Sequence, residues 1–293
     1  MPRVRRAGSA TSTQRKATRL LIISTGAGSI TPEIEAKLRA KFARYLIIPL
    51  DPKQDFDKLI TPTARVVIAG GDGSVEYVVR KLADSKHPVG ILSLGTFNNF
   101  ALALGLPSDL DQQIEVIKKG RPRPITLGRV NGTVFLEACA IGLFGQTIAL
   151  GEAAKEWKYG TFAAELAKVL TAKPFSYELE GDISGSGSCM SLVFTNTTSI
   201  GSQMPVSDKT PEDPYLELSV HAGRSRTDIV KRVLARAVLS KHEEGGLGQV
   251  FRFRKLRVTT KPKVRIYADN AQLGRTPATI TAELSALHVI LSR

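Results

Sequence analysis

The sequence is poor in aromatic residues, cysteine and long apolar runs, and each shortage argues against a class of protein. Phe, Trp and Tyr make up 6% of the 293 residues, which leaves few rings to stack on bases. Neither a zinc-finger spacing nor an RNA-recognition signature occurs, so we expect no nucleic acid partner. Lys and Arg nevertheless outnumber Asp and Glu by 41 to 27, a net charge of +14. The simplest interpretation of this balance is a solvated basic surface. The functional interpretations are binding to an anionic membrane surface or to phosphate-bearing ligands.

The two cysteines, Cys139 and Cys189, stand far apart in apolar stretches. This placement is typical of buried thiols in a reducing compartment and argues against a disulfide. No run of about 18 apolar residues predicts a membrane span, and no apolar stretch behind the basic start predicts a secretory signal. We expect a cytoplasmic protein, peripheral to the membrane, with residues 1–16 as a disordered basic tail. An organelle transit peptide has a similar composition and ranks lower.

The first part of the chain alternates between strand and helix patterns. Thr31-Pro32-Glu33 combines a cap, a proline and an acid, which is typical of a helix start. The expected strands are 19–24, 45–50, 65–69 and 89–92, and further helices are expected at 74–83 and 98–104. Such alternation predicts an α/β fold, with a three-layer N-terminal domain over 17–122 built on a mainly parallel sheet.

After about Gly120 the pattern changes to short alternating segments. Asn131-Gly132 lies between apolar runs and predicts a hairpin turn. Strands are expected at 176–180, 190–195, 215–220, 250–259 and 264–268, long helices around 147–170 and 227–239, and a flexible hairpin loop at 181–188. We predict a β-rich, antiparallel, sandwich-like domain over 123–281.

The stretch VIAGGDGSVE holds three glycines around one aspartate. Gly70, Gly71 and Gly73 surround Asp72, between an apolar strand pattern and a helix pattern. Glycine lets backbone N–H groups approach an anion, and the following helix points its positive end at it. The motif is neither a Walker A loop nor GxGxxG. A plain strand-to-helix turn is the alternative, but three glycines in four positions favour phosphate binding.

A second motif, LGTFNNFA, occupies residues 94–101 and is followed by GLP at 105–107. GGDGS followed by these two motifs resembles the catalytic domain of diacylglycerol kinases, a group with sphingosine kinases and bacterial lipid kinases in the phosphofructokinase and NAD-kinase-like superfamily. NAD kinases also carry GGDG but lack the second motif. Dense identity is confined to residues 66–107, whereas the order of elements matches over most of the chain.

The resemblance implies ATP and Mg²⁺ as cofactors and a lipid substrate at an anionic membrane surface. It also implies that residues 282–293 return to the first domain and that an apolar cleft of the second takes the acyl chain. Asp72 becomes a metal candidate as well as a nucleotide candidate. The residues it assigns to the nucleotide are Gly70, Gly71, Asp72, Gly73, Ser74, Glu76, Gly95, Thr96 and Asn98.

Several positions depart from the family pattern. Residues 24–28 keep a glycine-rich loop but lack the family's Asn-Pro. Phe97 replaces a glycine and Asn99 an aspartate. Ala271 stands where the family's D-G-E motif has its glutamate, the proposed general base. Asp269 is therefore the candidate catalytic base, and the alternative is that it caps a tight turn.

The resemblance also points to a structural Mg²⁺ site at the family motif D-D-G-x-L-D. Residues 212–217 occupy that place and keep Asp213 as a metal candidate, with Pro214 in place of glycine. His242 beside two acids is a weak metal signal. Trp157 and Tyr159 predict either core packing or a membrane-edge contact.

Three functions follow, in order of preference. The first is an ATP-dependent lipid kinase acting on a hydroxyl of diacylglycerol or a related lipid. The second is a catalytically impaired member that binds nucleotide or lipid, which Phe97, Asn99 and Ala271 favour. The third is a small-molecule kinase of the NAD-kinase kind. The sequence is compatible with a homodimer and does not decide the oligomeric state.

Overall fold

The computed structural model describes residues 16–24, 30–53, 55–146, 172–200, 204–205, 207–221, 250–269 and 271–292. The basic tail, the expected helices at 147–170 and 227–239, Trp157, Tyr159 and His242 lie outside these ranges. None of the described helices is long and apolar enough to cross a membrane.

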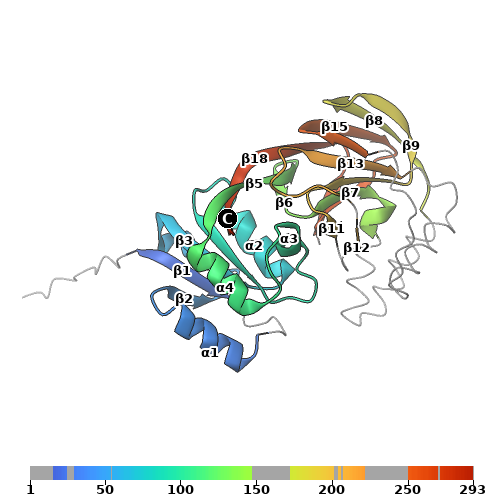
Figure 1. Ribbon diagram of the computed structural model, residues 1–293. Helices are drawn as coiled ribbons and strands as arrows, with labels where there is room; N and C mark the ends of the chain where they lie inside the picture. The colour runs from blue at the N-terminus through green and yellow to red at the C-terminus, as the bar shows by residue number, and fades with distance from the viewer. Residues whose placement is uncertain are drawn as a thin grey trace, which may run out of the picture.

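The first lobe is a parallel sheet with helices on both faces (Figure 1). Its strands pair in the order β2, β1, β3, β4, all parallel. Alternate residues of β1 and β3 face two separate cores, one under α2 and one under α1 and α4. The elements are β1 (Ala17–Ile23), α1 (Pro32–Lys41), β2 (Leu46–Pro49), the short η1 (Phe56–Lys58), β3 (Ile60–Gly70), α2 (Asp72–Leu82), β4 (Pro88–Ser93), α3 (Asn99–Ala103) and α4 (Leu110–Lys119).

The second lobe is a sandwich of antiparallel strands around one apolar core. One layer follows the order β14, β13, β10, β7, β16, β17, and the other holds β5, β6, β15, β8 and β9 together with part of β18. The elements are β5 (Arg121–Val130), β6 (Thr133–Phe135), β7 (Ala138–Gly142), β8 (Phe175–Gly181), β9 (Gly185–Cys189), β10 (Ser191–Thr195), β11 (Ser199–Ile200), β12 (Met204–Pro205), β13 (Leu216–His221), β14 (Val250–Phe253), β15 (Lys255–Lys261), β16 (Arg265–Ala268), β17 (Ala271–Arg275) and β18 (Ala278–Leu291).

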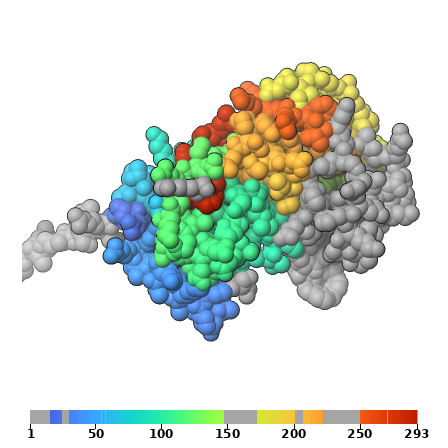
Figure 2. Space-filling view, in the orientation of Figure 1, coloured from blue at the N-terminus to red at the C-terminus, as the bar shows by residue number. Residues whose placement is uncertain are grey.

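Strand β18 joins the two lobes through one continuous sheet. Its late residues His288 and Val289 pair in parallel with β4, and its early residues pair antiparallel with β15. Strand β5 pairs antiparallel with β18 along most of the length of β18. In Figure 2 the red residues of β18 lie between the green first-lobe residues and the orange second-lobe residues. The predicted domain boundaries, 122/123 and 281/282, fall inside β5 and β18 and stay a prediction.

The fold class predicted from the sequence is confirmed, and so is the Asn131-Gly132 turn, which joins β5 to β6. Two local predictions were wrong. Residues 185–188 are not loop but belong to β9, because they pair in register with β8. The strand expected at 250–259 is interrupted at Arg254, where β14 ends in one sheet and β15 begins in the other.

Candidate nucleotide and catalytic site

The GGDGS loop lies at the carboxyl end of β3 and leads directly into α2. Gly71 caps this helix without a side-chain hydrogen bond, and the N–H groups of Ser74 and Val75 donate to its carbonyl oxygen, both at 3.0 Å. A Cβ atom added to Gly73 would meet nothing within 4 Å. The first turn of α2 therefore has open space beside it, as a backbone-bound anion requires.

Three other positions must be glycine for a different physical reason. A Cβ on Gly95 would lie 2.6 Å from the Cα of Gly71, and one on Gly71 would lie 3.1 Å from the Cα of Gly95. A Cβ on Gly70 would lie 2.7 Å from the Cβ of Ser74. Gly71 and Gly95 are needed because the two loops touch through their backbones, and Gly70 is needed because the side chain of Ser74 lies against it. A contact of theirs with phosphate stays a prediction.

Asp72 and Asn98 hold the two loops together. The N–H of Asn98 donates to Oδ2 of Asp72 at 2.8 Å. The Asn98 side chain closes its own loop, accepting from the N–H of Gly95 and donating to its carbonyl oxygen, both at 2.9 Å. Asn98 has a left-handed backbone with φ 54°, which asparagine tolerates better than most residues. Among the predicted nucleotide residues on the paired loops, Gly73 and Thr96 are the two exposed ones.

Asp269 lies in the turn between β16 and β17, and its side chain is 4% exposed. Its carboxylate accepts the main-chain N–H groups of Leu136 at 2.9 Å, Glu137 at 2.9 Å and Ala138 at 3.2 Å. Burial raises the pKa of Asp269, while these three donors and the Arg80 guanidinium favour its charged form. The carboxylate thus anchors the turn to the start of β7, and its role as base stays a prediction.

Arg80 on α2 carries the positive charge of the site. Its Nη2 lies 2.8 Å from Oε1 of Glu76, one turn earlier, and 3.5 Å from Oδ2 of Asp269. Burial and the nearby Asp269 raise the pKa of Glu76 to about 7, although Arg80 opposes this shift. Glu76 was predicted as a nucleotide contact, and the structure places it in this interlobe ion-pair group.

Glu137 is the acid that sequence reasoning missed. Nδ2 of Asn99 donates to its Oε2 at 3.1 Å, and Oδ1 of Asn99 accepts from the Ser199 hydroxyl at 3.3 Å. Burial, then Asp269 and Asp72, raise the pKa of Glu137 to about 9, while the hydrogen bond from Asn99 lowers it. The signal was present in the sequence, because Glu137 is an acid within the otherwise apolar run VFLEACAIG.

The remaining predicted positions do not join this group. Ala271 opens β17 opposite Ala268, with no carboxylate to offer. Asp213 accepts from the N–H of Thr210 at 2.8 Å, in the second-lobe segment that precedes β13. No group of three or more His, Cys, Asp or Glu is placed to hold a metal ion within the described ranges.

Comparison with known proteins matches residues 21–130 to the diacylglycerol kinase catalytic domain. A diacylglycerol kinase of Bacillus subtilis is 24% identical over 78% of each chain. A probable YegS-like lipid kinase of Klebsiella pneumoniae is 40% identical over 85 residues, covering 28% of this chain and 29% of that one. A diacylglycerol kinase structure from Bacillus anthracis superposes with a TM-score of 0.70 at 19% identity, over 95% of this chain and 98% of that one.

An NAD kinase from Archaeoglobus fulgidus, solved in complex with ATP, shares the fold at a TM-score of 0.53 and 13% identity, over 94% of this chain and 93% of that one. The glycine loop of β3 and the second loop after β4 both lie inside the matched segment. Residues 21–130 are therefore similar to the diacylglycerol kinase catalytic domain, which confirms the resemblance based on GGDGS and LGTFNNFA.

Proposed function

We propose that this protein is an ATP-dependent kinase that phosphorylates a hydroxyl group of diacylglycerol or a related lipid. The observation that carries the proposal is the pairing of the two glycine loops through Asp72 and Asn98 at the carboxyl ends of β3 and β4. Ligands of open α/β sheets bind at this edge. Two relatives named as diacylglycerol kinase and probable lipid kinase support the reaction class.

The residues present fit the phosphates of ATP with Mg²⁺. The open space at Gly73, beside a helix start whose cap makes no side-chain hydrogen bond, suits phosphate oxygens. Asp72 offers carboxylate oxygen, and Mg²⁺ bound to phosphates takes only one or two carboxylates from a protein. When bound, Mg²⁺ would neutralise charge on the phosphates. The loops hold and orient the nucleotide, and catalysis rests on this positioning.

Glu137 replaces Asp269 as our choice of base for the acceptor hydroxyl. The oxygens of Asp269 already accept three N–H groups and face Arg80, whereas the Glu137 side chain accepts one N–H group, from Asn99, among the residues that the structure describes. Glu137 takes the hydroxyl proton as the oxygen of that hydroxyl bonds to the γ-phosphorus and the bond to ADP breaks. Burial holds the pKa of Glu137 at about 9, so the ionised fraction of this carboxyl acts as the base and the activity should rise with pH towards 9.

A phosphate-transfer assay with labelled ATP and a panel of lipids in mixed micelles tests the proposal. We expect transfer to at least one lipid, and a fall of about 10²–10⁴-fold in kcat for Glu137→Gln with KM for ATP little changed. Glu178→Gln, an exposed acid of β8, serves as the matched control. A folded sample that binds ATP but transfers no phosphate to any lipid would contradict the proposal.

The second candidate, an impaired member that only binds nucleotide or lipid, is favoured by Ala271, which offers no carboxylate beside the Asp269 turn. The same assay distinguishes the active lipid kinase from the impaired member. Ala271→Glu would create activity from a silent background in the impaired case, while the lipid kinase is active without it. Phosphorylation of NAD instead of lipid would favour the NAD-kinase kind, which the shared fold and the GGDG motif support.

A further inference from the structure

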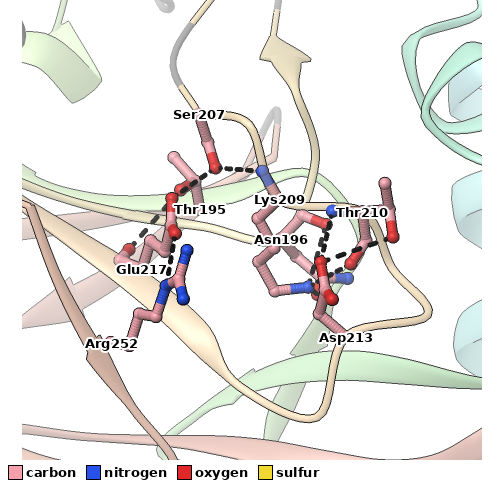
Figure 3. Close-up of polar contacts among 8 residues, drawn as sticks. All are labelled: Thr195, Asn196, Ser207, Lys209, Thr210, Asp213, Glu217 and Arg252. Atoms are coloured by element: carbon pink, nitrogen blue, oxygen red, sulfur yellow. Dashed lines mark hydrogen bonds and ion pairs between the residues drawn. The ribbon is translucent and has the colours of Figure 1, made fainter.

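Lys209 is a buried, charged side chain that the proposed reaction does not use. It lies in the second-lobe segment that precedes β13 and is 1% exposed. Its Nζ donates to Oδ1 of Asn196 at 2.9 Å, to the main-chain oxygen of Asn196 at 3.4 Å and to that of Thr210 at 2.6 Å. Figure 3 shows the ammonium group surrounded by these oxygens. An ammonium has three donors, and all three have acceptors here.

The surroundings of this ammonium are negatively charged. Burial lowers the pKa of Lys209 to about 8, and Asp213 and Glu217 act in the opposite direction, so the group is charged at neutral pH. Glu217 is itself held by the Ser207 hydroxyl at 2.6 Å and by Nε of Arg252 at 3.2 Å. Nζ of Lys209 also lies 5.8 Å from the centre of the Tyr215 ring, within cation–π range.

The acceptors of this ammonium are main-chain carbonyl and side-chain amide oxygens, and the Asp213 carboxylate acts on it by its charge, which is the chemistry of a hard-cation site. Main-chain carbonyl, side-chain amide and carboxylate oxygens are the donors that Mg²⁺ and Ca²⁺ take in proteins. The family resemblance predicts a structural Mg²⁺ at Asp213, but Lys209 places its positive charge beside that residue. We propose that the Lys209 ammonium is a built-in cation that takes the place of a bound metal ion, so the second lobe needs no divalent cation.

The internal cation also supports the residues of the candidate site. Lys209 fixes Asn196, whose Nδ2 donates to the carbonyl oxygens of Thr126 and Leu136, both at 3.0 Å. The N–H of Asn196 donates to the carbonyl oxygen of Glu137 at 2.8 Å. The hydrogen bonds thus run from Lys209 through Asn196 to the backbone that carries Glu137. Loss of the ammonium therefore disturbs both the lobe and the neighbourhood of the acid.

Thermal unfolding of the full chain without nucleotide tests the proposal. The wild-type protein is measured in EDTA, in Mg²⁺ and in Ca²⁺, alongside Asp213→Asn in the same buffers. We expect the wild-type Tm to be the same in all three. A rise of several degrees in Mg²⁺ or Ca²⁺ that Asp213→Asn abolishes would overturn the proposal, because it would show a metal ion at this site.

Lys209→Met, which keeps the apolar stem and removes the charge, is the second measurement. Its Tm should fall by about 10 °C, because the oxygens and Asp213 lose their cation. Lys261→Met, at an exposed position on β15, is the matched control and should leave the Tm within about 1 °C. An unchanged Tm for Lys209→Met would also overturn the proposal. If that variant does not fold, the wild-type cation series alone decides.

Discussion

At the residue scale, the acids of the candidate site are arranged differently from the family pattern. The pattern's carboxylates at positions 99 and 271 are an amide and a methyl group in this chain, whereas Glu137 lies against the Asn99 amide at 3.1 Å. Burial opposes the charge on Glu137, and neighbouring Asp269 and Asp72 add repulsion. An acid kept in such surroundings costs stability, and acids of this kind gather at functional sites, which supports the proposed role of Glu137.

This cost predicts a pH-dependent stability that Glu137→Gln removes. The folded pKa of about 9 lies above the ordinary value of 4.5, so the folded state holds this proton more tightly than the unfolded state. The contribution is complete below pH 4.5 and is lost as the pH rises towards 9. At pH 8, without nucleotide, we expect Glu137→Gln to raise the free energy of unfolding by about 2 kcal/mol.

Urea unfolding at pH 5 and pH 8 measures the difference. The free energy of unfolding of Glu137→Gln should lie closer to that of the wild-type protein at pH 5 than at pH 8. Glu178→Gln should change the free energy of unfolding at neither pH. A variant less stable than wild type at pH 8 would show that Glu137 is ionised and satisfied in the folded protein. The raised pKa of Glu137 would then be contradicted.

At the scale of elements, the two loops and the start of α2 form one unit, in which the glycines have separate tasks. Gly71 and Gly95 allow the loops to touch, but Gly73 alone among the GGDGS glycines has open space at its Cβ position. Gly73→Ala should therefore fold, and it should gain about 0.5–1 kcal/mol because Gly73 lies within a helix. The added methyl group should weaken ATP binding about tenfold by keeping the phosphates away from the backbone.

Calorimetric titration with ATP and a melting curve measure both effects on one sample. Gly185→Ala on β9, where a Cβ also meets nothing within 4 Å, is the matched control and should leave ATP affinity unchanged. Equal ATP affinity in wild type and Gly73→Ala would remove the first turn of α2 from the nucleotide site.

The sequence predicted these elements well where the pattern is local, and less well where a contact is distant. Thr31 caps α1 by accepting from the N–H of Ile34, as the motif Thr-Pro-Glu indicates, and Val75, Val78, Val79 and Leu82 are the buried face of α2. Glu137 and Lys209 could not be placed because their partners lie 38 and 13 residues away in the chain. Glycine-rich residues 185–188 carry no strand pattern, and β9 exists through its pairing with β8.

At the scale of the whole molecule, β18 is a strand that both lobes share, and we expect it to couple their unfolding. Leu287 and Val289 are fully buried in the first-lobe core, and Ile280 is fully buried in the second-lobe core, on the same strand. Arg80 adds an ion pair across the lobes to Asp269. We expect a strand shared in this way to transmit a loss of packing in one lobe to the hydrogen bonds of the other, because β4 and β15 both pair with its backbone within one sheet.

Leu287→Ala and Ile280→Ala, at opposite ends of β18, should therefore destabilise both lobes together. Each should cost about 2–5 kcal/mol from lost burial and the cavity left behind. Hydrogen exchange should show protection falling by a similar factor in β3 of the first lobe and β10 of the second, whichever residue is changed. The control is Leu284→Ala, an exposed side chain on the same strand that should leave both values unchanged. Protection lost in only one lobe would mean that the lobes unfold separately and that β18 connects them without coupling their stability.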